Sequence, residues 1–168
     1  MTQLFAQPYD ISANGFYFEN GEEFTEKSSN NRNAYGDPVE EYEIQFIDGD
    51  AIDCALAEAI GIHQGNFNRF FEIIDQWSDD EKLRYILAVG ECGHDFDINR
   101  GDPGDLDVDI YHLNSMRELA EEFVAEGLFG DIPGHLIHYI NYDAVARDLA
   151  VDYTETEIAG DYLIYRAG

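Results

Sequence analysis

Residues 105–126 read DLDVDIYHLNSMRELAEEFVAE, and this stretch decides the predicted fold class. Acidic and apolar residues alternate over 105–111, which predicts a β-strand with one apolar and one acidic face. Ser115 and Glu118 then have the spacing of a capping box, and apolar residues recur at helical spacing over 116–124. A strand that leads directly into a capped helix indicates an α+β fold.

The same stretch carries two expected rows of carboxylates. These are Asp105, Asp107 and Asp109 on the strand, and Glu118, Glu122 and Glu126 at i, i+4 and i+8 on the helix. Neighbours would lie ~6.8 Å apart along the strand and ~6 Å apart along the helix axis. Like charges at this helical spacing cost roughly 0.2–0.5 kcal/mol per pair, so folding does not account for them. A solvated face is the ordinary interpretation of any one row.

The excess of acid extends along the whole chain. Of 168 residues, 36 are Asp or Glu and nine are Lys or Arg, which gives a net charge of −27. Three small domains are expected: α/β at 1–60, helical at 61–103 and α/β at 104–168, with net charges of −11, −5 and −11. Self-repulsion on this scale destabilises a compact state. The chain is nevertheless expected to fold, because 45% of its residues are hydrophobic, too many for a disordered acidic segment.

Periodicity, caps and turn residues predict the remaining elements. Strands are expected at 4–6, 15–19 and 41–46, helices at 50–60, 67–77 and from Ser78, a helix capped by Asn141 or Asp143, and a hairpin at 155–166 turning near Gly160-Asp161. Ser78 and Glu81 form a second capping-box pair, and Gly61 and Gly127 are expected helix stops. The segments 26–38 and 90–105 are expected to be a loop and a linker.

The charge limits the class of partner. An acidic surface of this size repels nucleic acid and anionic membranes, so we expect a basic protein partner, no direct nucleic-acid binding and no membrane association. No apolar run approaches the ~18 residues of a membrane span, and a cytoplasmic location is predicted. Cys54 and Cys92 lie too far apart in the sequence for a metal-binding pair and are interpreted as reduced structural thiols.

No sequence pattern indicates catalysis. Residues 95–101 resemble the start of an EF-hand loop, but that loop needs Gly at its sixth position and Glu at its twelfth, where this chain has Arg100 and Leu106. Two other candidates, the pair His135 and His138 and the sequence Cys92-Gly93-His94, lack a third ligand or orienting group. We therefore expect no catalytic residue, no metal ion and no cofactor.

Three segments carry a family resemblance: GFYFE at 15–19, EEFVAEGLFGDIP at 121–133 and INYDAVARDLAVDYTETEIAGDYLIYR at 140–166. Together with the acidic total, they make the chain resemble the ArdA antirestriction family over essentially its entire length. The resemblance implies a protein carried by mobile genetic elements that protects incoming DNA by mimicking bent B-form DNA. The implied target is the methyltransferase core of type I restriction-modification enzymes, whose restriction activity, and with it modification, is blocked competitively.

The resemblance also implies an elongated chain of three small domains, with carboxylates in place of phosphates, and a homodimer joined through its C-terminal part. The segment 121–133 corresponds to the family's antirestriction motif, near the dimer contact. The candidate phosphate-mimicking residues are Glu22, Glu23, Glu41, Glu43, Asp75, Asp79, Asp80, Asp105, Asp107, Asp109, Glu118, Glu122, Glu126, Asp148, Asp152, Glu155 and Glu157. Phe129, Ile132 and Leu136 are candidates for the dimer contact, because exposed apolar groups mark interfaces; a place in the local core is the alternative.

Other classes of function stay open at this point. An acidic chaperone or binding module for another basic protein would share the composition. An acid-adapted hydrolase or a calcium-binding protein would share the carboxylates, and adaptation to high salt would also raise the acid content. A dimer long enough to fill a DNA-binding groove favours the DNA mimic, a compact monomer favours the chaperone, and stoichiometric metal favours the third class.

Overall fold

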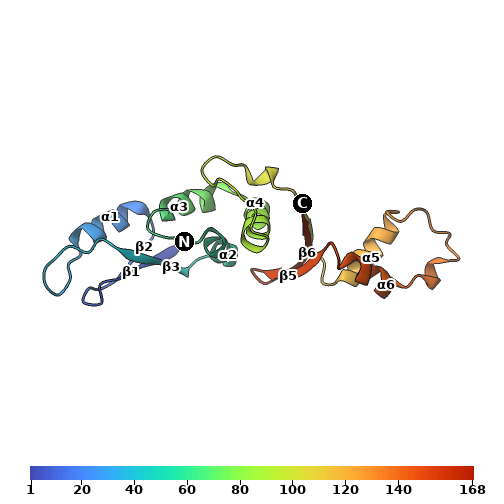
Figure 1. Ribbon diagram of the computed structural model, residues 1–168, viewed down its shortest axis with the longest axis horizontal. Helices are drawn as coiled ribbons and strands as arrows, with labels where there is room; N and C mark the ends of the chain where they lie inside the picture. Colours follow the sequence, from blue (N-terminus) through green and yellow to red (C-terminus); the bar gives the residue numbers. More distant parts are fainter. The chain divides into compact units, whose positions relative to one another are not determined.

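The computed structural model describes residues 1–168 and contains six α-helices and two three-stranded antiparallel sheets (Figure 1). The predicted α+β class is confirmed. The chain divides into two compact units, Met1–Leu106 (unit 1) and Asp107–Gly168 (unit 2). Unit 1 contains the first two predicted sections, and the finer division into three domains stays a prediction. None of the helices is both long and apolar enough to cross a lipid bilayer.

The sheet of unit 1 has the strand order β2-β1-β3. Its strands are β1 (Gln3–Pro8), β2 (Phe16–Phe18) and β3 (Tyr42–Asp48). Side chains alternate across the sheet, with Tyr42 and Ile44 of β3 buried beside Leu4 and Ala6 of β1. This alternation gives the sheet one face that packs on helices and one that faces solvent.

The expected loop at 26–38 is wrong for its first part, because α1 (Gly21–Asn30) extends to Asn30. Asn20 caps this helix by accepting a hydrogen bond from the Glu23 backbone N–H at 2.9 Å. Phe24 is the only buried residue of α1, so the helix shows no apolar period that a sequence pattern could reveal. The cap and the packing of Phe24 determine it instead.

Aromatic side chains join the sheet of unit 1 to α1 and to α3 (Phe67–Gln76). The Phe24 ring lies 5.7 Å from Tyr42 and 4.7 Å from Phe67, and Phe67 lies 5.1 Å from Phe18. Such aromatic pairs contribute about 0.5–1.5 kcal/mol each beyond the area that they bury. Phe18, Phe24, Phe67 and Phe70 are therefore core residues of unit 1.

Two further helices complete unit 1. They are α2 (Ala51–Ile60), which ends at Gly61 with φ 63° as predicted, and α4 (Asp79–Tyr85), which continues into the π-helix η1 (Ile86–Glu91). Lys82 of α4 and Asp53 of α2 are each 5% exposed and form an ion pair of 2.7 Å. This buried pair links the two helices.

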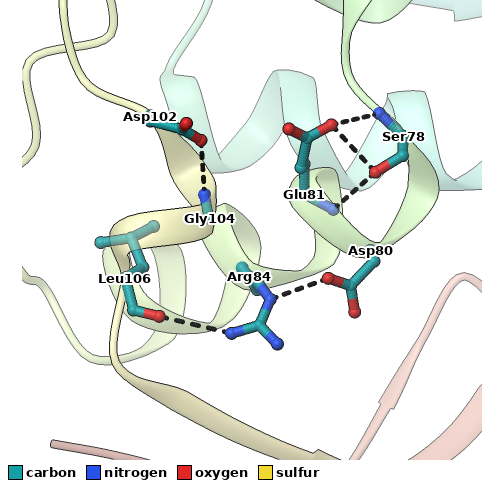
Figure 2. Close-up of polar contacts among 7 residues, drawn as sticks. All are labelled: Ser78, Asp80, Glu81, Arg84, Asp102, Gly104 and Leu106. Atoms are coloured by element: carbon teal, nitrogen blue, oxygen red, sulfur yellow. Dashed lines mark hydrogen bonds and ion pairs between the residues drawn. The ribbon is translucent and has the colours of Figure 1, made fainter.

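Figure 2 shows how α4 begins and how it holds the chain that follows. The Ser78 hydroxyl accepts from the Glu81 N–H, and the Glu81 carboxylate accepts from the Ser78 N–H, so the predicted capping box is confirmed in both directions. Arg84 donates to Asp80 at 2.8 Å and to the carbonyl of Leu106 at 3.4 Å. Within the predicted linker, Asp102 caps the short 3-10 helix η2 (Pro103–Asp105).

Unit 2 has the strand order β4-β6-β5. Its strands are β4 (Val108–Tyr111), β5 (Thr154–Ile158) and β6 (Asp161–Ala167). The β5–β6 hairpin is confirmed, and its turn falls at Ala159 and Gly160, one residue before the predicted position. Both turn residues have positive φ, 54° and 88°, as the twist of a two-residue hairpin requires.

Two helices cover one face of this sheet and supply the core of unit 2. They are α5 (Met116–Ala125) and α6 (Tyr142–Leu149), which Asn141 caps as one of the two predicted alternatives. Met116, Leu119 and Phe123 of α5 pack with Ile164 of β6. The predicted apolar stripe is therefore confirmed, and the helix stops at Gly127 with φ 81°.

Candidate functional site

The basic residues of the chain are largely engaged within it. Of the nine Lys and Arg residues, seven form ion pairs with eight carboxylates. Of the other two, Arg32 donates to the backbone carbonyls of Ser29 and Asn31, at the end of α1. Consequently 28 of the 36 carboxylates have no Lys or Arg partner within 4.0 Å. The negative charge is left for solvent or for a partner.

None of the seventeen candidate carboxylates is buried. The exposed ones are Glu22, Glu41, Glu43, Asp75, Asp79, Asp80, Asp105, Asp107, Glu126, Asp148, Asp152, Glu155 and Glu157, and the half-buried ones are Glu23, Asp109, Glu118 and Glu122. They occur in both units, on helices, strands and loops. A partner that binds all of these carboxylates must therefore contact many helices, strands and loops.

Several candidates in unit 1 also serve the fold. Glu23 accepts from the Glu19 N–H and pairs with Lys27 at 3.3 Å, and Asp80 pairs with Arg84. Glu22, Glu23, Asp79 and Asp80 lie in the first turns of α1 and α4, where negative charge stabilises the helix dipole. Four others, Glu41, Glu43, Asp75 and Asp105, make no ion pair. These four are the free candidates of unit 1.

The predicted strand row in residues 105–109 is wrong. Asp105 ends the 3-10 helix η2, which begins because Asp102 accepts from the Gly104 N–H and Pro103 occupies its first position. β4 begins only at Val108, so Asp109 is the one member of the row on a strand. Its carboxylate accepts from Arg166 at 2.6 Å, and this hydrogen bond raises the pKa of Arg166.

The helical row in unit 2 forms on α5 and at its C-cap, with different roles along it. The Ser115 hydroxyl accepts from the Glu118 N–H, as the predicted capping box requires. The Glu118 carboxylate, however, accepts from the N–H of Asn114, the residue before the cap, at 2.8 Å. Glu122 and Glu126 make no ion pair. The helix tolerates this row because its core residues and its caps at both ends stabilise it.

Glu155 has a structural partner that its position on a strand did not indicate. Its carboxylate accepts from the backbone N–H of Met116, 39 residues earlier, at the first position of α5. The side chain of β5 therefore supplements the Ser115 cap and joins the sheet to the helix. Glu157, Asp107, Asp148 and Asp152 make no ion pair, and together with Glu126 they are free, exposed candidates of unit 2.

Arg117 shows how the few cations are used in unit 2. It pairs with Asp143 of α6 at 2.7 Å and with Glu121 of its own helix at 3.0 Å, and these hydrogen bonds raise its pKa. Its guanidinium also lies 5.9 Å from the centre of the Tyr142 ring. The cation joins α5 to α6 and does not offset the charge of the free carboxylates.

The three candidate contact residues lie in the segment 127–140, between α5 and α6. Phe129 and Leu136 are 55% and 44% exposed, and Ile132 is half-buried. Sequence reasoning missed that Leu128, Ile137 and Tyr139 are exposed beside them, at 62%, 43% and 84%. The signal was available, since seven large apolar residues, these six and Ile140, fall within one segment that has no strand or long helix. None of these seven residues is buried.

The residues with possible chemistry are not gathered into one centre. No group of three or more His, Cys, Asp or Glu side chains is arranged to hold a metal ion. Asp97 closes a turn by accepting from the Asn99 N–H, and His138 lies in the 3-10 helix η3 (Ile137–Tyr139). Burial and the nearby Glu58 carboxylate raise the pKa of the Cys54 thiol, which lowers the fraction of nucleophilic thiolate.

Comparison of the chain with protein-family models and with curated proteins finds no match.

Proposed function

We propose that this protein is an antirestriction protein of the ArdA type, which binds the DNA-binding groove of a type I restriction-modification enzyme. The observation that carries the proposal is the division of charge: eight of the nine Lys and Arg residues have partners within the chain, while 28 carboxylates have no cationic partner. An array of this kind can engage the Lys and Arg side chains that otherwise hold DNA phosphates. The sequence resemblance over 121–166 directs the proposal to type I enzymes.

The amount of charge fits a short duplex. DNA carries one charge per ~1.7 Å of axis, so a net charge of −27 matches about 46 Å of duplex, and a dimer matches about 92 Å. We further propose the elongated three-domain arrangement and the homodimer that the resemblance implies. A mimic that is already shaped to the groove avoids the cost of bending that DNA incurs. Because phosphate contacts carry no base sequence, one inhibitor would act on enzymes with different recognition sites.

A competition assay tests the proposal. Purified type I methyltransferase is bound to a labelled duplex at low salt, and increasing amounts of the protein are added before electrophoresis. We expect complete displacement of the duplex, no complex between the protein and DNA, and weaker displacement as salt rises. Failure to compete at large excess with active enzyme would show that the protein is not a DNA mimic. Binding to unrelated basic proteins with the same affinity would favour the acidic chaperone.

The homodimer has its own test. We propose that Phe129, Ile132 and Leu136 form the contact, because they are apolar, none is buried, and they lie within the proposed motif at 121–133 or three residues after it. Phe129→Asp should give monomers in analytical ultracentrifugation. Val151→Asp, at a residue that is 82% exposed outside this segment, is the matched control and should leave the dimer intact. A folded Phe129→Asp variant that stays dimeric would place the contact elsewhere.

A further inference from the structure

Three large apolar side chains are exposed on two neighbouring loops of unit 1. Tyr9, Ile11 and Tyr35 are 66%, 100% and 85% exposed, and we call them the apolar tip. Tyr9 and Ile11 lie on the loop between β1 and β2, and Tyr35 lies on the loop between α1 and β3. The two loops lie side by side at one end of unit 1 (Figure 1). The free carboxylates do not explain this surface.

Hydrogen bonds fasten the two loops to each other. The Asn33 side chain donates to the Asp10 carboxylate at 2.9 Å, and the Ala34 N–H donates to the Ser12 hydroxyl at 3.3 Å. Asn31 donates to the carbonyl of Asn14 at 2.9 Å. The bonds from Asn33 and Ser12 lower the pKa of Asp10, so its carboxylate stays ionised as the acceptor. The tip residues are therefore presented on an ordered backbone.

Each loop is also ordered internally. The Asn33 side-chain oxygen accepts from the backbone N–H groups of Tyr35 and Asp37, both at 2.9 Å, and the Asp10 carboxylate accepts from the Ser12 N–H. Ordering a loop in advance lowers the entropy that a binding partner must remove. Tyrosine on such loops supplies large contact area with few rotatable bonds. These are the properties of an interface anchor.

The negative charge around the tip indicates which kind of surface it can bind. Glu41 accepts a backbone hydrogen bond from Tyr9, Asp37 lies in the loop of Tyr35, and Asp37, Glu40 and Glu41 are all exposed without ion pairs. The Arg32 guanidinium instead holds the carbonyls at the end of α1. A second copy of the tip would place these free carboxylates against one another, and they would also repel an anionic membrane. Only a basic protein surface complements this rim.

We propose that the apolar tip enters an apolar pocket, rimmed by Lys or Arg, on the type I methyltransferase that the carboxylates engage. This inference rests on the proposed function and adds a second kind of contact to it. Contacts between exposed charges weaken as salt rises, whereas apolar contacts do not. The tip therefore supplies the part of the affinity that is insensitive to salt.

The test compares the dissociation constants of two double variants with that of the unsubstituted protein. Ile11→Ser with Tyr35→Ser removes the two most exposed side chains of the tip, and Val151→Ser with Tyr162→Ser is the matched control, at residues 82% and 59% exposed in unit 2. Affinity for purified type I methyltransferase is measured in two concentrations of potassium chloride. The tip variant should bind at least about tenfold more weakly in both, with an unchanged ratio between the two salts. The control should stay within about twofold.

Each remaining outcome decides the inference. If the tip variant binds like the unsubstituted protein, the tip is not an anchor, and the proposed function still stands. A loss that disappears at one salt concentration, or a change of oligomeric state in ultracentrifugation, would also overturn the inference. If the unsubstituted protein does not bind the enzyme, the proposed function fails and the tip has a different partner. Circular dichroism checks folding, and Ile11→Ala is the milder variant should the double variant unfold.

Discussion

Units 1 and 2 differ in their cores but carry the same density of charge. Unit 1 has a net charge of −17 over 106 residues and unit 2 has −10 over 62, about one excess negative charge per six residues in each. Unit 1 buries a network of aromatic rings, whereas unit 2 packs α5 on β6 through Met116, Leu119, Phe123 and Ile164. Because two units with different cores have the same charge per residue, we infer that function, and not folding, accounts for the charge.

The two units also differ in whether their ion pairs are buried. Unit 1 buries one ion pair, Asp53 with Lys82, while every ion pair of unit 2 has exposed partners. Removing one partner of a buried pair leaves an uncompensated charge, which costs far more than removing an exposed partner. The comparison therefore predicts where single substitutions will destabilise the protein.

The largest expected effect is that of Lys82→Met on unit 1. The free energy of unfolding should fall by about 3–5 kcal/mol, because Asp53 stays buried without its partner. Trp77, the only tryptophan, lies in unit 1 against Tyr85 and reports this unit during urea denaturation. Lys27→Met, at an exposed pair with Glu23, is the control and should cost at most about 1 kcal/mol.

Two observations would change this interpretation. Asp53→Leu combined with Lys82→Met should recover much of the lost stability, since an apolar pair can replace a buried ion pair. If Lys82→Met lowers the free energy of unfolding no more than Lys27→Met, water reaches the Asp53–Lys82 pair in solution. The exposed fraction of 5% would then understate its contact with solvent.

Neutralising free carboxylates tests whether the two units, which have the same charge per residue, contribute equally to binding. One set is Glu41→Gln, Glu43→Gln, Asp75→Asn and Asp105→Asn in unit 1, and the other is Glu126→Gln, Asp148→Asn, Asp152→Asn and Glu157→Gln in unit 2. At ~0.2–1 kcal/mol per exposed pair, each set should weaken binding to the methyltransferase by ~1–4 kcal/mol and flatten its salt dependence. Thermal melting should show equal or greater stability, because self-repulsion is relieved. Inhibition lost with one set only would confine the binding surface to that unit.

The helix caps give a smaller effect that can be compared between the units. Ser78→Ala and Ser115→Ala should each cost about 1 kcal/mol of stability. The cost should be larger at Ser78, whose capping box has both arms, because Glu155 still accepts from the Met116 N–H when Ser115 is changed. Amide hydrogen exchange in α4 and α5 measures the two helices separately. A larger cost at Ser115 would mean that Glu155 does not support the cap.

The smallest expected effect is that of Asp107→Asn alone. Asp107 is exposed and makes no ion pair, so its contribution to binding is one exposed pair among many, at most about 1 kcal/mol. The measurement is the affinity for the methyltransferase at two salt concentrations. A catalytic or metal-binding mechanism predicts the opposite, because one carboxylate would then abolish activity. Complete loss of inhibition in a folded Asp107→Asn protein would overturn the distributed mechanism.

Sequence reasoning succeeded where the signal is local. The capping box at Ser78, the stop at Gly61 and the apolar stripe of α5 depend on residues within about one helical turn. It failed at α1, whose only buried residue is Phe24, and at Asp105, where a short 3-10 helix replaced the expected strand. The causes differ: α1 has no apolar period to detect, whereas at Asp105 the Asp102 cap and Pro103 start a 3-10 helix within the alternating stretch.

The sequence alone determined the excess of negative charge, its even spread and the mixed α+β class, because these follow from composition and from neighbours along the chain. Only the tertiary structure decided which charges are free. Lys82 binds Asp53, which is 29 residues away in the sequence. Met116 binds Glu155 across 39 residues, and Arg166 binds Asp109 across 57. The apolar tip likewise exists because Asn33 reaches Asp10 from 23 residues away. Such partners are chosen by the packing of strands and helices, which brings distant residues within hydrogen-bonding distance and leaves the remaining carboxylates exposed.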